Sequence, residues 1–319
     1  MVQFLVKRFI GLLFVVIGVT FITFVMGLNA PGDPIVAMMG VHPDPKEYLA
    51  LKHIYGLDLP WWQQYYNYLH NLFTFNFGLS YEYKNRSVTD ILASGVPISL
   101  ELGFWALFID LLVGIPLGII SALKANTWVD TTNMTFMLVL YATPTFALAF
   151  FTQAFILWLD KRTGLGWPVS QWGNPWHYSW SDIQFKLAPI LVYAATGVAY
   201  FARLSRTATL EVLCQDYVRT ARSKGLREQL VIYRHALRNA MIPLVTVIGI
   251  TIGFLVAGAY FIESIFNIPG IADITLTSIS NRDYPVIQAT TVLLAIAVVL
   301  GNLLSDILYT LVDPRVKIR

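Results

Sequence analysis

Charged side chains are scarce in this chain. Asp, Glu, Lys and Arg make up 13% of its 319 residues, whereas 56% of the residues are hydrophobic and the mean hydropathy is +0.60. Soluble globular domains carry about 25% charged residues. Because this chain has half that charge and a larger apolar share, its composition excludes the ordinary soluble class and indicates a membrane protein.

Cysteine is nearly absent as well. Cys214 is the single cysteine, so no internal disulfide can form. No group of Cys and His has the spacing of a zinc site, and no GxxxxGK[ST] sequence for binding ATP phosphates occurs. The net charge of +3 is too small to indicate a nucleic-acid partner. We therefore expect no catalytic residue, bound metal or cofactor in this chain.

Six hydrophobic runs are candidates to cross a bilayer, which takes about 20 mostly apolar residues in a helix, and Leu187–Ala202 is the weakest because it is short. We therefore expect an all-α polytopic membrane protein. The first run is too long for the core of a signal peptide and no small-x-small cleavage site follows it, so we expect it to be retained. The predicted spans are Phe9–Leu28, Ile98–Leu123, Met134–Leu159, Leu187–Ala202, Ile242–Ile262 and Val286–Val312.

The distribution of Lys and Arg predicts the orientation. Six spans place both termini on one side, and that side carries 14 of the 22 basic residues. Four of the other eight lie in the loop 29–97, which is too long for the positive-inside rule to apply. We therefore expect residues 1–28 to be a cytoplasmic tail with the first span, 98–312 to be the transmembrane core, and the tail 313–319 to be cytoplasmic.

The loop 29–97 is polar and predicted to hold helices on the extracytoplasmic side. Asp44 and Pro45 suit an N-cap and first helical position, and Gly56 suits the end of that helix. A second helix is expected after Pro60, and its Trp and Tyr residues favour the membrane–water interface. This region is either a docking surface for an external protein or a structural cap over the spans, and the two interpretations are compatible.

A second outside loop, 164–185, is rich in tryptophan. Clustered Trp side chains can stack on sugar rings, but an aromatic belt at the membrane surface explains them more simply. The tryptophans are Trp167, Trp172, Trp176 and Trp180.

The cytoplasmic loop 203–241 holds eight of the 22 basic residues. It reads as two short helices around Gly225, where a positive φ is expected. An apolar stripe follows on the second helix at Leu226, Leu230, Tyr233 and Leu237. Such a segment either inserts into a groove on a soluble partner or lies on anionic membrane lipid, and the residues alone leave both open. The basic residues are Arg203, Arg206, Arg219, Arg222, Lys224, Arg227, Arg234 and Arg238.

This loop resembles the signature loop of importer-type ABC transporter permeases. That signature has an Ala-containing triplet, a Gly four residues after it and a downstream Pro, found here as Arg219-Thr220-Ala221, Gly225 and Pro243. The triplet differs from the usual Glu-Ala-Ala, and the spacing from Gly to Pro is longer than in sugar permeases. Both departures are typical of the dipeptide/oligopeptide branch.

The resemblance extends over nearly the whole chain. The long first outside loop looks like that of the first of the two permease subunits in this branch. Further matching stretches are Ala30-Pro31-Gly32-Asp33-Pro34, Tyr55-Gly56-Leu57-Asp58, Phe77-Gly78-Leu79-Ser80-Tyr81, Ile115-Pro116-Leu117-Gly118, Glu263 to Gly270, Asn281-Arg282-Asp283-Tyr284-Pro285 and Asp313-Pro314-Arg315.

The resemblance implies a type I ABC importer permease fold in a bacterial or archaeal cell membrane. The chain would form half of a peptide pathway with a second permease as a pseudo-symmetric heterodimer. Two ATPase subunits would bind ATP and Mg, and an extracytoplasmic peptide-binding protein would deliver the substrate. A coupling helix would contact the ATPase through Asp216, Tyr217, Arg219, Thr220, Ala221, Arg222, Gly225, Leu226, Leu230, His235 and Pro243.

Ala221 and Gly225 are the residues on which we expect coupling to depend most, since the first permits close approach and the second sets the turn. His235 is expected to pack or cap rather than to catalyse. Ionisable residues at membrane depth are candidates for the substrate pathway, and Glu101, Asp110 and Glu263 are the ones we select.

Two other classes of protein compete with this interpretation. A stand-alone channel or secondary transporter would show inverted repeats and paired charges at mid-membrane, and neither is apparent. An intramembrane enzyme would need a motif such as HExxH or GxGD, and neither occurs. The substrate itself stays open, because relatives of this branch also carry nickel chelates, glutathione or oligosaccharides.

Overall fold

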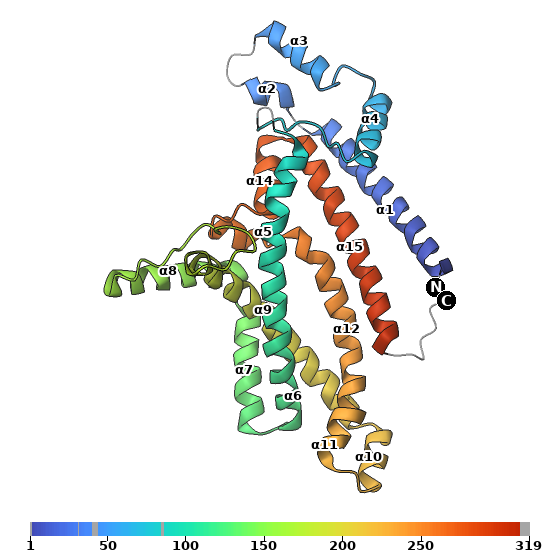
Figure 1. Cartoon of the computed structure of the whole chain (residues 1–319), viewed down its shortest axis with the longest axis vertical. Coiled ribbons are helices and arrows are strands. Elements are labelled where there is room, and N and C mark those ends of the chain that lie inside the picture. Colours follow the sequence, from blue (N-terminus) through green and yellow to red (C-terminus); the bar gives the residue numbers. More distant parts are fainter. Residues whose placement is uncertain (1, 31, 40–43, 84–85, 313–319) are drawn as a thin grey trace.

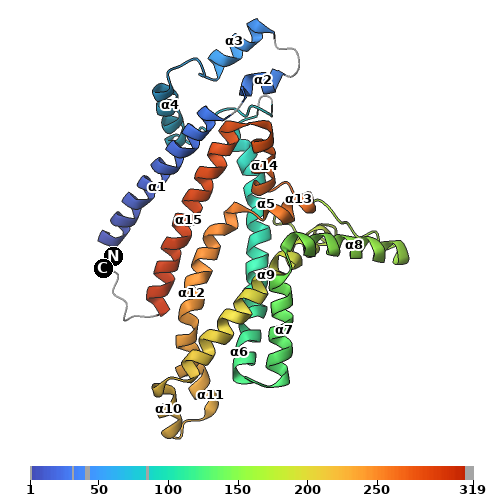
Figure 2. The same ribbon diagram turned by 180° about the vertical axis from the view of Figure 1, so that it is seen from behind.

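The computed structural model describes residues 2–30, 32–39, 44–83 and 86–312. Every regular element in these ranges is a helix, apart from one isolated bridge between Leu79 and Ser87. The helices form an elongated bundle, with α2, α3 and α4 at one end and α10 and α11 at the other (Figures 1 and 2). The all-α prediction is confirmed for the described residues.

Five helical segments are long and apolar enough to cross a membrane, and a sixth is added if one bent pair counts as a span. The second segment joins α5 to α6 through a π-helical turn at Asp110–Gly114. The five comprise α1 (Val2–Asn29), α5 (Val88–Ile109) with α6 (Ile115–Leu123), α9 (Trp180–Leu213), α12 (Leu237–Phe254) with the helical turns before it, and α15 (Tyr284–Val312).

The predicted third span is not one straight helix. Helix α7 (Trp128–Ala142) and α8 (Thr145–Thr163) meet at an angle of 98°, and α8 projects sideways from the bundle in Figure 1. Pro144 lies at the break. Proline has no backbone N–H to donate and forces the residue before it away from helical geometry, so the bend is at Thr143.

Several predicted boundaries differ from the observed ones. Helix α5 begins at Val88 rather than Ile98, because the Ser87 hydroxyl accepts a hydrogen bond from the N–H of Asp90 (3.0 Å) and caps the helix. Helix α9 extends the predicted span at both ends into polar sequence. Helix α12 ends at Phe254, ahead of Gly258 with φ +74°, so residues up to 262 do not continue it.

The outer cap consists of α2 (Pro34–Met39), α3 (Pro45–Ile54), α4 (Trp61–Phe73) and the chain from there to Ser87. The predicted N-cap is confirmed, because the Asp44 carboxylate accepts from the N–H of Lys46 (2.9 Å). Helix α4 buries Leu72 beside Val16 of α1 and Val292 of α15. The cap is therefore packed on the outer ends of two spans.

Small residues let α12 and α15 pack closely. Gly253 of α12 lies against Gly301 of α15, and a Cβ at Gly253 would stand 3.2 Å from the Cα of Gly301. The Ser305 hydroxyl also donates to the carbonyl of Thr246 (3.0 Å). Such small-residue contacts are typical of helix pairs in membranes, where backbones associate through close packing.

Candidate functional site

The basic loop forms a compact helical turn between α9 and α12. It contains α10 (Asp216–Ser223), α11 (Glu228–Leu230) and a π-helical turn at Val231–Ala236 that leads directly into α12. Figure 1 places this turn at the end of the bundle farthest from the outer cap. The chain thus reverses direction between Leu213 and Leu237 while remaining attached to two long helices.

The inner side of the turn is a small apolar cluster. Val218 and Val231 are fully buried, Ala221 is 5% exposed, and the partly buried Val212 of α9 packs against them. Ala221 therefore faces the rest of its own turn. Its small size matters first for the contact between α10 and the π-helical turn, a role that the sequence pattern alone did not indicate.

The outer side of the turn carries exposed apolar side chains. Leu226, Leu230 and Tyr233 are 37%, 42% and 72% exposed, and Tyr217 of α10 is 42% exposed. The predicted continuous helical stripe through Leu226 and Leu237 is wrong, because Leu226 precedes α11 and the π-helical turn changes the period after Val231. The exposed row nevertheless remains, with Leu237 half-buried at its end.

Gly225 sets the reversal between α10 and α11. Its φ of +73° confirms the predicted left-handed conformation, and a Cβ there would touch nothing within 4 Å. The requirement for glycine therefore comes from the backbone rather than from space. Across this turn Arg222 donates to both carboxylate oxygens of Glu228, at 2.7 and 3.2 Å. This two-point contact fixes the relative position of α10 and α11.

Two of the eight basic residues make contacts with α7. Arg206 of α9 donates two hydrogen bonds of 2.7 Å to Asp130 of α7. Arg203 lies over the ring of Tyr141, at 4.7 Å from its centroid. The exposed basic side chains of the turn are Arg219, Arg222, Lys224, Arg227, Arg234 and Arg238.

The remaining predicted coupling residues have local roles. The Thr220 hydroxyl donates to the carbonyl of Asp216 (2.9 Å), and the amide of Asn239 donates to the Tyr217 hydroxyl (2.9 Å) and to the carbonyl of His235 (3.2 Å). Pro243 lies inside α12, where its missing N–H leaves the carbonyl one turn earlier without a helical donor.

Glu101, predicted as a pathway residue, is fully buried in contacts within this chain. It accepts hydrogen bonds from Lys186 Nζ (2.7 Å), Trp172 Nε1 (2.9 Å) and the N–H of Trp176 (2.8 Å). Lys186 also donates to the carbonyls of Asn174 and His177 (2.7 and 2.8 Å). The network connects the outer loop 164–179 to α5 and α9. Glu101 therefore has a structural role at this contact.

Glu263 is also fully buried, in the short helix α13 (Tyr260–Ile265). It accepts from the Ser99 hydroxyl (2.7 Å) and from the N–H groups of Ala259, Ala272 and Asp273 (3.1, 2.9 and 3.1 Å). These contacts hold α13 and α14 (Ile271–Asn281) against α5. Both carboxylate oxygens of Glu263 therefore have hydrogen-bond partners within the chain.

Asp110 differs from these two carboxylates. It opens the π-helical turn in the α5–α6 span, is 7% exposed and lies against Gly197 of α9, where a Cβ would collide with its carboxylate. Its Oδ1 atom has no hydrogen-bond partner among the described residues. Of the three selected carboxylates, only Asp110 keeps an unsatisfied oxygen. Within the described ranges no cluster of three His, Cys, Asp or Glu residues could hold a metal ion.

Sequence reasoning missed Asp283, which is fully buried at the start of α15. It accepts from the Ser80 hydroxyl and from the N–H groups of Tyr81 (3.0 Å) and Glu82 (3.3 Å). These contacts tie the outer cap to the last span. The only sequence signal was its place in one of the stretches that resemble the permease family.

Comparison with known proteins decides the family. Residues 114–318 match the family described as binding-protein-dependent transport system inner membrane component, and residues 1–103 match its N-terminal membrane-component region. The chain belongs to this family. It is 36% identical over 319 residues to the dipeptide transport system permease protein DppB of Bacillus subtilis, covering 100% of this chain and 99% of the relative.

Further similar proteins include a second permease and a solved transporter structure. The glutathione transport system permease protein GsiC of Escherichia coli K12 is 34% identical, with 99% of each chain covered. The solved MetNI methionine ABC transporter shares the fold, with a TM-score of 0.54 and 19% identity over 70% of this chain and 96% of that one. The chain is therefore a multi-pass membrane permease of the ABC importer class with the type I fold.

Proposed function

We propose that this chain is the first permease subunit of an importer for short peptides, coupled to ATPase subunits through the cytoplasmic helical turn. The observation that carries the proposal is the two-sided construction of that turn. Its inner side packs on Val212 of α9 and on the π-helical turn that leads into α12, and its outer side exposes Leu226, Leu230 and Tyr233 beside six basic side chains. An apolar row with a basic rim suits a groove with acidic edges on a soluble partner.

Helix α9 connects the turn to the opposite end of the bundle. It has 34 residues without a break, which at about 1.5 Å per residue makes it about 50 Å long. Its cytoplasmic end enters the turn, and Lys186 near its outer end is fixed to Glu101 and to the loop 164–179. Movement of the turn by an ATPase is thus carried along a rigid rod to the outer surface.

The rest of the transporter lies in partner chains. ATP and Mg would be bound by two ATPase subunits, a second permease would complete the pathway, and an external binding protein would dock on the outer side. The exposed Trp61, Trp62 and Tyr66 of α4 support a position of the outer cap at the membrane–water interface, which we assign to the outer side. This orientation leaves both termini in the cytoplasm of a bacterial or archaeal cell, with the spans in contact with membrane lipid.

Peptides are favoured over the other solutes by the relatives and by one structural observation. Both the dipeptide and the glutathione permeases named above handle peptides, since glutathione is a tripeptide. Trp172, one of the tryptophans that kept a sugar substrate open, is 1% exposed and donates to Glu101. It therefore offers no surface for stacking on a sugar.

A Tyr233→Asp variant tests the coupling surface. Tyr233 is 72% exposed, so the change leaves the fold intact while placing a charge in the apolar row. We expect the variant to reach the membrane with the second permease but to lose the ATPases and peptide uptake, whereas Tyr233→Phe retains both. Wild-type ATPase association and uptake by Tyr233→Asp would contradict the proposal.

A further inference from the structure

The outer cap borders an open cavity of about 790 Å³ above the outer ends of α1 and α15. This volume is in the range of small-ligand sites, about 300–1,000 Å³. Four separate stretches that resemble the permease family all contribute to its wall. They supply Ala30, Gly32, Asp33 and Pro34; Tyr55, Gly56 and Leu57; Phe77, Gly78, Leu79 and Tyr81; and Tyr284 and Pro285.

Contacts between these stretches hold the cavity wall in place. Asp283 binds the loop at Ser80 and Tyr81, and the ring of Tyr81 packs edge-on against Tyr55 at 4.8 Å. The guanidinium of Arg282 lies over Gly32, where a Cβ would stand 2.9 Å from its central carbon. A wall fixed by buried and aromatic contacts is present before any ligand arrives.

The floor of the cavity is closed toward the membrane. A Cβ at Gly27 of α1 would stand 3.5 Å from the Tyr284 ring and 3.7 Å from the Gln288 amide of α15, so the two helices cross in contact. Phe24 of α1 stacks beside Tyr68 of α4, with ring centroids 6.5 Å apart. With α1 and α15 in contact at this crossing, the cavity is suited to a ligand that arrives from water.

Two charged side chains of opposite sign are found among the described residues of the wall, Asp33 and Lys52. Asp33 accepts from the Tyr48 hydroxyl (2.6 Å) and the N–H of Ile35 (2.9 Å). Partial burial opposes ionisation of Asp33, but these hydrogen bonds and the charge of Lys52 outweigh it and lower the pKa of Asp33. The cavity lining therefore holds one negative and one positive side chain, and the guanidinium of Arg282 lies against the wall at Gly32.

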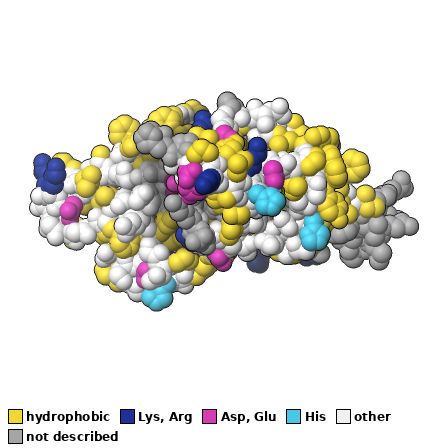
Figure 3. Space-filling model, turned by 90° about the horizontal axis from the view of Figure 1, so that it is seen from above, with side chains coloured by type: hydrophobic (Ala, Val, Ile, Leu, Met, Phe, Trp, Pro, Cys, Tyr) yellow, Lys and Arg dark blue, Asp and Glu magenta, His cyan; other side chains and the backbone are white. Residues whose placement is uncertain are grey.

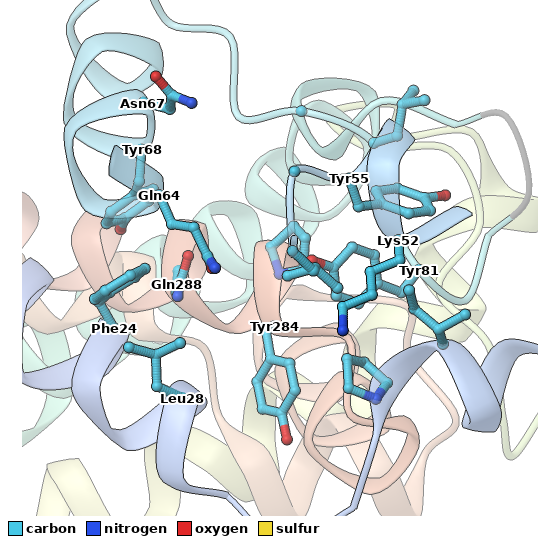
Figure 4. A pocket seen from close by; sticks show the side chains of 18 of the residues that line it. Phe24, Leu28, Lys52, Tyr55, Gln64, Asn67, Tyr68, Tyr81, Tyr284 and Gln288 are labelled. Atoms are coloured by element: carbon cyan, nitrogen blue, oxygen red, sulfur yellow. The ribbon is translucent and has the colours of Figure 1, made fainter. Parts of the chain in front are cut away.

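Charged and neutral polar side chains of the wall face the same space. The ammonium of Lys52 reaches into the cavity, and Gln64 and Gln288 point toward the same space (Figure 4). The hydroxyl of Tyr284 is buried and has no hydrogen-bond partner among the described residues. Viewed from above, this face shows charged side chains scattered among apolar and uncharged ones (Figure 3). The uncharged polar groups of the wall are Tyr48, Tyr55, Gln64, Asn67, Tyr68, Asn71, Tyr81, Tyr284 and Gln288.

We propose that this cavity is an outer subsite for a short peptide with both termini free. Lys52 would bind the terminal carboxylate, Asp33 the terminal ammonium, and the amide and phenol groups the peptide backbone. A neutral sugar makes no use of two opposite charges, and an anionic chelate would be repelled by Asp33. This inference rests on the proposed peptide function and adds a site on the permease itself.

The test uses the assembled transporter in lipid nanodiscs, without the external binding protein. Binding of the dipeptide Ala-Phe is measured by saturation-transfer NMR, with N-acetyl-Ala-Phe and Ala-Phe-amide as blocked probes. We expect Ala-Phe to bind, and either blocked terminus or a Lys52→Gln change to weaken binding about tenfold, as expected for loss of a charge-assisted hydrogen bond. Lys46→Gln, on the same helix but outside the cavity, is the matched control and should bind normally.

Two results would overturn the subsite. One is equal binding of Ala-Phe by the wild type and the Lys52→Gln variant. The other is binding in phosphatidylglycerol nanodiscs that disappears with phosphatidylethanolamine, whose head group carries the same two charges and would then be the natural occupant. Peptide uptake by the complete transporter with its binding protein is measured separately. If the wild type imports no peptide, the proposed function fails, whereas normal uptake by the wild type together with either of the two results above removes only the subsite.

Discussion

Lys186 of α9 and Glu101 of α5 form a buried ion pair, with 2.7 Å between Nζ and Oε1 and side-chain exposures of 3% and 0%. The pair is completed by the indole of Trp172 and by two backbone carbonyls that accept from Lys186. Buried charges are tolerated when every oxygen and proton has a partner. The arrangement makes the outer loop 164–179 part of the rigid body that contains α9.

Removal of one partner from this pair tests its structural role. In Lys186→Met, Glu101 would remain buried with its charge uncompensated, and we expect a loss of about 3–5 kcal/mol in the free energy of unfolding. Thermal unfolding of the purified protein in detergent measures this loss. Lys161→Met, at an exposed position on α8, is the control and should unfold like the wild type. An unchanged unfolding temperature for Lys186→Met would show that the ion pair does not stabilise the fold.

Gly225 offers a test of the coupling geometry. Its φ of +73° is disfavoured for a β-branched residue, so Gly225→Val should misdirect α11 without any steric clash. We expect the assembled variant to hydrolyse ATP with little peptide uptake. Gly225→Asn is the matched control, because Asn tolerates the left-handed conformation, and it should retain most uptake. Normal uptake by Gly225→Val would refute the requirement for this turn.

Ala221 tests whether the turn acts as one packed unit. A Trp at this position, which is 5% exposed beside Val218 and Val231, would separate α10 from the π-helical turn. We expect Ala221→Trp to increase hydrogen exchange at the amides of 218–236 and to lose ATPase binding, while Ala221→Ser has little effect. Slow exchange together with lost binding would instead place Ala221 in direct contact with the ATPase.

The outer cap provides a pH-dependent contact. His53 Nδ1 lies 2.8 Å from Asp58, and the hydrogen bond to this carboxylate raises the pKa of His53 above its usual 6.5. Because the pKa is higher in the folded state, the stabilisation is present below pH 6.5 and is lost as pH rises through the folded pKa. NMR titration of the His53 ring should show the raised pKa, and Asp58→Asn should return it toward 6.5. Identical titration curves would exclude the contact in solution.

The sequence alone predicted features that depend on near neighbours. The hydrophobic runs located the spans, the Asp44 cap and the Gly225 turn were confirmed, and the resemblance to peptide permeases led to the family. These features come from the hydrophobicity of continuous segments and from backbone preferences of single residues. Both are encoded within a few residues of each position.

Only the tertiary structure decided what the buried polar residues do. Glu101 and Lys186 are 85 positions apart, and Ser80 and Asp283 are 203 apart. No local pattern shows that such residues meet, so Glu101 and Glu263 had the sequence signature of pathway residues although their oxygens are occupied by the chain itself. The same reasoning applies to Ala221, whose burial depends on the reversal at Gly225, and to the cavity, whose wall combines four distant stretches. Packing brings these groups together, and packing is a property of the whole chain.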